Sequence, residues 1–218
     1  MAWGPREVAM GIAVVAAVTV ATVGLLTLAY RDDGAPSGAV LAGTLALETA
    51  MLVVAVVLGP AGRAPTWLLF GLRRLGTPVQ FFWGAVAFTG SIIAGAIYVA
   101  IATRISEDLT PSALPIDIPG GGLRLLAFAV IVLIGPFAEE VFFRGFVLAG
   151  LLRRLGTTRA ILVSSALFAV AHLDLTVAGP AFLAGVVYAI VYRRTGSLWP
   201  LVLAHTAQNA IAFGLAAA

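Results

Sequence analysis

Several separate apolar runs of about twenty residues constrain this chain more than any other feature, because each can cross the roughly 30 Å hydrocarbon core of a bilayer as a helix. Only 11% of the 218 residues are charged, against about 25% in soluble domains, which is too few to coat a globule of this size. The sequence therefore predicts an all-α fold, a polytopic transmembrane helix bundle. Soluble enzymes, secreted disulfide scaffolds and disordered binding proteins are excluded.

Hydropathy divides the chain into about seven predicted spans, at residues 8–30, 38–60, 82–103, 123–150, 158–173, 177–192 and 197–217. Residues 63–75 mix aromatic, Leu and Arg side chains, which is typical of a short helix lying in the membrane interface. The Pro- and Gly-rich residues 105–122 predict a loop. We therefore expect an N-terminal part, residues 1–104, with three transmembrane helices and the interfacial helix, and a second part at residues 123–214.

Arginine is distributed unevenly between the two predicted sides of the membrane. Nine arginines lie on the side of the N-terminus and its connected loops, and three lie on the opposite side. Because cytoplasmic loops of membrane proteins are enriched in Lys and Arg, we expect an integral protein of a bacterial inner membrane with a cytoplasmic N-terminus. The net charge of +3 follows from this topology, and no nucleic-acid partner is predicted.

Ionisable side chains inside the predicted spans are the main functional signal, since each costs several kcal/mol unless it is paired or hydrated. The chain has no cysteine and no lysine, which excludes a cysteine nucleophile and a Schiff-base lysine. The polar groups within spans are Glu48, Glu139, Glu140, Arg144, His172 and His205, with Asn209 and Gln208 as polar neighbours.

Three of these side chains come from different helices but are predicted at a similar depth. Measured from the arginine-rich side at about 1.5 Å of rise per residue, Glu139 lies roughly 21 Å deep, His172 about 20 Å and His205 about 16 Å. Unrelated structural histidines have no reason to converge in this way. We therefore expect a site among the fourth, fifth and seventh spans.

Local spacing assigns different roles to the two adjacent carboxylates. Glu140 and Arg144 are separated by four residues and can pair on one helix face. Glu139 lies about 100° around the helix from Glu140 and is free to face a cavity. Pro136 removes a helix hydrogen bond and, in α-helical register, leaves the carbonyl of Val132 free.

Three short motifs resemble those of the CPBP family, which includes CAAX prenyl protease 2 and Abi-type bacteriocin-immunity proteins. They are Glu139-Glu140-Val-Phe-Phe-Arg144, Phe168-Ala-Val-Ala-His172 and His205-Thr-Ala-Gln-Asn209. The first motif alone is a weak signal, but all three occur in order and within predicted spans. The resemblance covers about residues 123–214.

This resemblance implies an intramembrane endopeptidase acting on a membrane-embedded or lipidated peptide or protein. Glu139 and His172 would activate the attacking water, and His205 and Asn209 would stabilise the oxyanion. Glu140 and Arg144 would form a structural pair. Members of the family are also called metalloproteases: Glu139, His172 and His205 could instead hold one zinc ion. The residues fit both schemes, and we favour the metal-free one, which needs no cofactor.

Two other functional classes use similar residues. A transporter or proton relay also places Glu and His in membranes, but the chain has no inverted repeat and its ionisable groups gather at one level. A non-catalytic immunity protein could bind a partner in the same cavity. Glu48 lies outside every motif, and we expect it to be protonated or hydrogen-bonded to a neighbour.

Overall fold

The computed structural model describes residues 3–31, 34–59, 66–72, 77–106, 109 and 120–216, and these are almost entirely helical, with no strand among them. Five helical stretches in this part of the chain are long and apolar enough to cross a membrane: α1 (Pro5–Ala29), α2 (Ser37–Leu58), α4 (Pro78–Ile105), the stretch Gly122–Ala171 and α8 (Leu175–Thr195). They are followed by α9 (Trp199–Ala216). The predicted all-helical membrane bundle is confirmed, and the count of seven spans stays a prediction.

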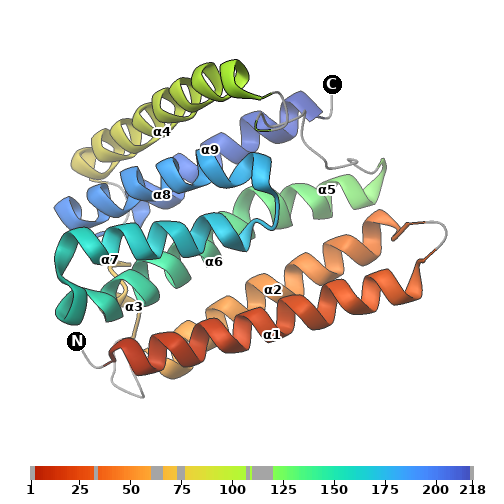
Figure 1. The fold of residues 1–218 in the computed structure, drawn as a ribbon, viewed down its shortest axis with the longest axis horizontal. Helices are drawn as coiled ribbons and strands as arrows, with labels where there is room; N and C mark the ends of the chain where they lie inside the picture. The colour runs from red at the N-terminus through yellow and green to blue at the C-terminus, as the bar shows by residue number, and fades with distance from the viewer. Residues whose placement is uncertain are drawn as a thin grey trace.

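The stretch Gly122–Ala171 doubles back on itself at Gly156, where φ is 70° and ψ is 173°. Glycine adopts this positive φ without a steric penalty, so the chain reverses there, and α7 returns alongside the preceding arm (Figure 1). The predicted loop at 151–157 is therefore helical except at this residue. The elements in order are α5 (Gly122–Phe128), η2 (Ala129–Ile134), α6 (Gly135–Glu140), η3 (Val141–Leu148) and α7 (Ala149–Ala171).

Two groups of helices enclose the α5–η3 arm. The α1–α2 hairpin packs against α6 and η3, while α4 lies across α8 and α9 on the other side (Figure 1). Close approach of the hairpin depends on Gly11, because a Cβ atom there would lie 2.7 Å from Phe146 Cε1 and 2.8 Å from Val54 Cγ1. Trp3 secures the start of the hairpin by donating its Nε1 hydrogen to the carbonyl of Phe146 at 2.9 Å.

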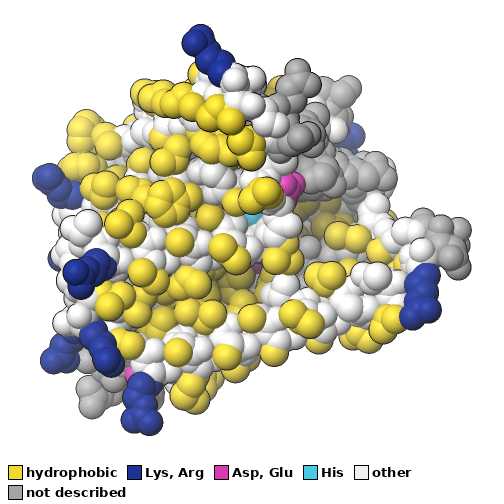
Figure 2. Space-filling model, in the orientation of Figure 1, with side chains coloured by type: hydrophobic (Ala, Val, Ile, Leu, Met, Phe, Trp, Pro, Cys, Tyr) yellow, Lys and Arg dark blue, Asp and Glu magenta, His cyan; other side chains and the backbone are white. Residues whose placement is uncertain are grey.

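The outer surface has the character expected in lipid. Large apolar side chains are exposed along α1, α4 and α9, and in Figure 2 they cover the visible face, with arginines gathered mainly at one end of the bundle. Exposed apolar surface of this extent is unfavourable in water. It is the expected solvent-facing composition when the surrounding medium is hydrocarbon.

The predicted interfacial helix at 63–75 is shorter than expected. The structure has only α3 (Thr66–Leu69) in this region, and residues 63–65 and 73–75 lie outside the described parts of the chain. Phe70 is fully buried, its carbonyl accepts a hydrogen bond from the Tyr192 hydroxyl at 3.1 Å, and the Gly71 carbonyl accepts one from Leu198 N–H at 3.1 Å. The described end of the segment thus packs into the bundle, and its interfacial position stays a prediction.

Two stretches of π-helix flank α6, which carries the adjacent residues Glu139 and Glu140. In η2 the N–H of Gly135 bonds to the carbonyl of Val130, five residues earlier, whereas an α-helix uses a spacing of four. In this register the carbonyl that lacks a backbone donor because of Pro136 is that of Ile131. The α-helical register had predicted the carbonyl of Val132. The Ile131 carbonyl accepts the side-chain amide of Asn209 at 2.9 Å. Single π-helical turns occur frequently at functional sites.

Candidate active site

Glu140 connects the motif on α6 to His205 on α9. Its Oε1 atom accepts a hydrogen bond from Arg144 Nη1 at 2.9 Å and lies 3.2 Å from His205 Nδ1. Glu140 and Arg144 are both essentially inaccessible to solvent. The predicted pair of Glu140 and Arg144 is therefore present, and the carboxylate has an additional contact that its spacing does not indicate. When Nδ1 of His205 donates to Glu140, the ring is oriented with its Nε2 directed away.

His205 in turn approaches the second carboxylate. The distance from His205 Nε2 to Glu139 Oε2 is 3.7 Å, which is longer than a direct hydrogen bond. Glu139 keeps 21% of its side-chain surface exposed, and its Oε2 atom has no hydrogen-bond partner among the described residues. The Oε2 atom is itself buried, so the exposed surface belongs to the rest of the Glu139 side chain.

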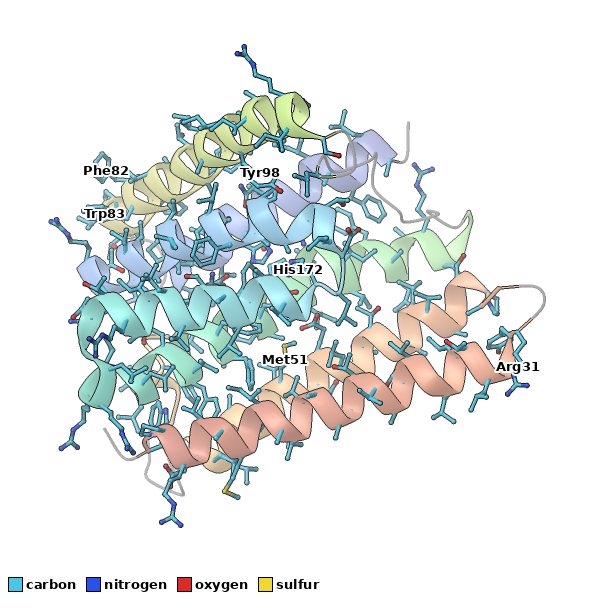
Figure 3. The ribbon with its side chains drawn as sticks, viewed as in Figure 1. Arg31, Met51, Phe82, Trp83, Tyr98 and His172 are labelled. Carbon is cyan, nitrogen blue, oxygen red and sulfur yellow. The ribbon has the colours of Figure 1, made fainter. Side chains whose placement is uncertain are left out.

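His172 lies in the bundle interior, immediately after the last residue of α7 (Figure 3). Its Nδ1 is 2.8 Å from the carbonyl of Phe168, and because a carbonyl only accepts, Nδ1 carries the hydrogen and the neutral ring has a free Nε2. The Phe168 ring separates the histidines, with its centroid 4.8 Å from His172 and 5.9 Å from His205. The two imidazoles are thus neighbours that are not directly bonded.

The turn after His172 is constrained by its own hydrogen bonds. Leu173 has a positive φ of 54°, and Asp174 caps α8 by accepting from the Thr176 N–H at 2.8 Å and the Thr176 hydroxyl at 2.7 Å. These hydrogen bonds hold the pKa of the Asp174 carboxyl below its usual value. The capped turn therefore fixes the point at which α7 ends. It also fixes the position of His172, which is the first residue of the connection to α8.

A cavity of about 550 Å³ is lined by three of the four predicted catalytic residues, and His205 is not among its lining residues. Glu139, His172 and Asn209 all line it, and so does Glu48 from α2. Figure 2 shows histidine atoms in a recess of the apolar surface above the α1–α2 hairpin. Asn209 uses one amide hydrogen on the Ile131 carbonyl, and since its amide group has two hydrogens, one is left for a group in the cavity.

A second cavity, of about 340 Å³, lies between α4, α8 and α9 and is lined by both His172 and His205. Its polar wall is a hydrogen-bonded chain in which the Tyr188 hydroxyl donates to Gln208 Oε1, and Gln208 Nε2 donates to Ser91 Oγ at 2.7 Å. Sequence analysis does not identify Ser91 and Tyr188 as part of the site. Both could have been predicted as site residues because they are polar side chains within predicted spans, where such side chains need polar partners.

The donors for the alternative zinc site are not assembled as that scheme requires. In the described part of the chain, no group of three or more His, Asp or Glu side chains is arranged to hold a metal ion. The term metalloprotease is therefore not supported for this chain.

Comparison with known proteins connects this geometry to a family. Residues 121–211 match the family described as type II CAAX prenyl endopeptidase Rce1-like, and that range contains Glu139, His172, His205 and Asn209. The resemblance to the CPBP family is confirmed. The match lies on α5 to α9, so the elements that carry the CPBP motifs are those that enclose the two cavities, with α2 and α4 supplying the remaining walls.

One curated relative is the protein named "Putative membrane peptidase YdiL" of Bacillus subtilis (strain 168). It is 30% identical over 143 residues, which are 64% of this chain and 54% of the relative. The aligned segment thus spans about half the length of that protein. No solved structure gives a significant match to this chain. Together the two matches support a CAAX-type intramembrane protease in general terms.

Proposed function

We propose that this protein is an intramembrane endopeptidase that hydrolyses a peptide bond of a membrane-embedded or membrane-associated substrate. The observation that carries the proposal is that Glu139, His172 and Asn209, from three different helices, line one cavity of about 550 Å³. This volume is within the range of small-molecule binding sites and accommodates a short extended peptide segment with water.

In the first step, Glu139 is the general base. Its carboxylate, which lines the cavity, accepts a proton from water as the water oxygen adds to the peptide carbonyl carbon. His172 presents its free Nε2 to the same cavity and orients the water. The proton held by Glu139 then passes to the leaving amine as the C–N bond breaks, so the carboxylate is restored.

The oxyanion formed in this step is stabilised from α9. The carboxylate of Glu140, 3.2 Å from His205 Nδ1, fixes the orientation of the ring, and His205 donates a hydrogen bond to the oxyanion from Nε2. The second amide hydrogen of Asn209 provides another donor. Fixed donors aimed at developing negative charge in a site of low dielectric commonly supply a large part of the catalytic effect.

The direct test is cleavage of membrane-embedded peptides by the purified protein in detergent, with and without a chelator. We expect cleavage that the chelator leaves unchanged, because every step of the proposed reaction uses side chains of this chain. Cleavage that is lost with chelator and restored by zinc would replace the glutamate mechanism with a metal-dependent one. A protein that cleaves no member of a broad library of such peptides would count against the endopeptidase itself.

The lining of the cavity also indicates from which side of the membrane a substrate enters. Its lining includes Ala35 and Ser37 at the start of α2, and this start lies at the end of the bundle opposite to the one at which most arginines gather (Figures 1 and 2). If the arginine-rich end is cytoplasmic, as positive-inside statistics favour, substrate segments enter the site from the non-cytoplasmic side of the membrane.

Cysteine labelling tests this orientation cleanly, because the chain has no cysteine of its own. In spheroplasts treated with a membrane-impermeant maleimide, we expect Ser37→Cys to be labelled directly. The control Thr157→Cys, exposed at the arginine-rich end, should be labelled only after permeabilisation. The opposite pattern would reverse the orientation and with it the side from which the substrate enters.

A further inference from the structure

We propose that Glu48 of α2 holds the attacking water together with Glu139, as a protonated acid that donates a hydrogen bond into the cavity. This inference rests on the proposed function and adds a residue outside the matched family segment, which begins at residue 121. Glu48 would be a catalytic residue supplied by the N-terminal part of the chain.

The position of Glu48 brings its carboxyl group close to the helix that carries Glu139. A Cβ atom built on Gly135 would lie 3.5 Å from Glu48 Oε1, and Gly135 is one helical turn before Glu139 on α6. Both carboxyl groups line the same cavity, together with His172 and Asn209. At 3.5 Å such a Cβ atom would be in ordinary van der Waals contact with Glu48, so the Glu48 carboxyl lies directly against α6.

The surroundings of Glu48 do not account for it as a structural residue. Its side chain is 4% exposed, and its Oε2 atom has no hydrogen-bond partner within the described ranges. Arg144, the buried cation of the bundle, is already paired with Glu140. A buried carboxyl group without a partner is costly, and more so when ionised. The neutral acid with its hydroxyl directed into a hydrated cavity is the arrangement that avoids this cost.

A neutral Glu48 complements an ionised Glu139. The hydroxyl of Glu48 donates to one lone pair of the water, and Glu139 accepts one of the hydrogens of that water, which leaves the other lone pair to attack the carbonyl carbon. Glu48 keeps its proton throughout, and the proton released by the water goes to Glu139. Holding the nucleophile from both sides limits the orientations that it samples, and loss of such positioning costs about 100-fold in rate.

Three substitutions on α2 separate this role from a structural one. Glu48→Gln keeps a hydrogen-bond donor of the same shape, and we expect its kcat to stay within a few-fold of wild type. Glu48→Met keeps only the size, and we expect kcat to fall about 100-fold with KM and melting temperature unchanged. The matched control is Thr44→Val, which changes the same cavity wall one turn away at a hydroxyl already bonded to the Val40 carbonyl, and which should behave as wild type.

Infrared spectroscopy supplies a readout that does not depend on cleavage. The difference spectrum of wild type minus Glu48→Gln should contain the C=O stretch of a carboxylic acid at neutral pH, shifted in D₂O because the acid contacts exchangeable water. Absence of that band would overturn the proposal, whether or not a substrate is found. So would a Glu48→Met protein that cleaves like wild type while Glu139→Gln is inactive, a result that would leave the proposed endopeptidase intact.

Discussion

Glu139→Gln is expected to reduce cleavage by about 10²–10⁴-fold, the usual contribution of a general base. Glutamine has the same shape and fills the same space, but it cannot accept the proton that the attacking water must lose. Because Glu139 is partly exposed to the cavity and its Oε2 atom bonds to no other described group, the change breaks no structural contact. The melting temperature in detergent should therefore be unchanged while kcat falls and KM is retained.

The same variant distinguishes catalysis from partner binding. An immunity protein that acts by binding a toxin in the cavity would keep its affinity and its cellular effect with Gln at residue 139, since the shape of the site is preserved. A cellular phenotype that survives Glu139→Gln would thus argue against the enzyme. Loss of the phenotype together with loss of cleavage in the purified protein would support it.

The helical class and the membrane setting follow from the apolar runs, because a run of about twenty apolar residues has few other stable conformations. The convergence of Glu139 and His205 on one region was also predictable from depth alone, and the two side chains approach within 3.7 Å. The depth of a residue is predictable because transmembrane helices run roughly parallel to one another. The number of residues along a helix therefore converts directly into a distance across the membrane.

Rotation about the helix axis was much harder to predict than depth. The π-helical turns of η2 and η3 change the register on both sides of Glu140. A helical wheel with 3.6 residues per turn therefore assigns the free carbonyl near Pro136 to the wrong residue. The contact of Glu140 with His205 joins residues 65 positions apart, and nothing in the local spacing indicates it. Glu48 could be recognised as a buried acid but not placed in the cavity, because that depends on how α2 packs on α6.

Arg144→Met is expected to lower the free energy of unfolding by about 3–5 kcal/mol, the cost of leaving a buried charge without its partner. The Arg144 guanidinium is 1% exposed and bonds Glu140 at 2.9 Å, with its Cζ atom 4.3 Å from the centre of the Phe168 ring. Methionine fills much of the space but leaves the buried Glu140 carboxyl without its cation. Denaturation in mixed micelles measures the change, and Arg154→Met, at an exposed arginine, should stay within about 0.5 kcal/mol of wild type.

Adding Glu140→Gln to Arg144→Met should restore much of the lost stability, because replacing both members of a buried ion pair removes the uncompensated charge. Cleavage should not recover, since Glu140 also contacts His205 Nδ1 and an amide holds the imidazole less strongly than a carboxylate does. The double variant thus separates two tasks of one carboxylate, which are to neutralise Arg144 and to hold His205 ready to donate. If the double variant regained both stability and wild-type kcat, Glu140 would be structural alone, and the oxyanion would have to be stabilised from elsewhere.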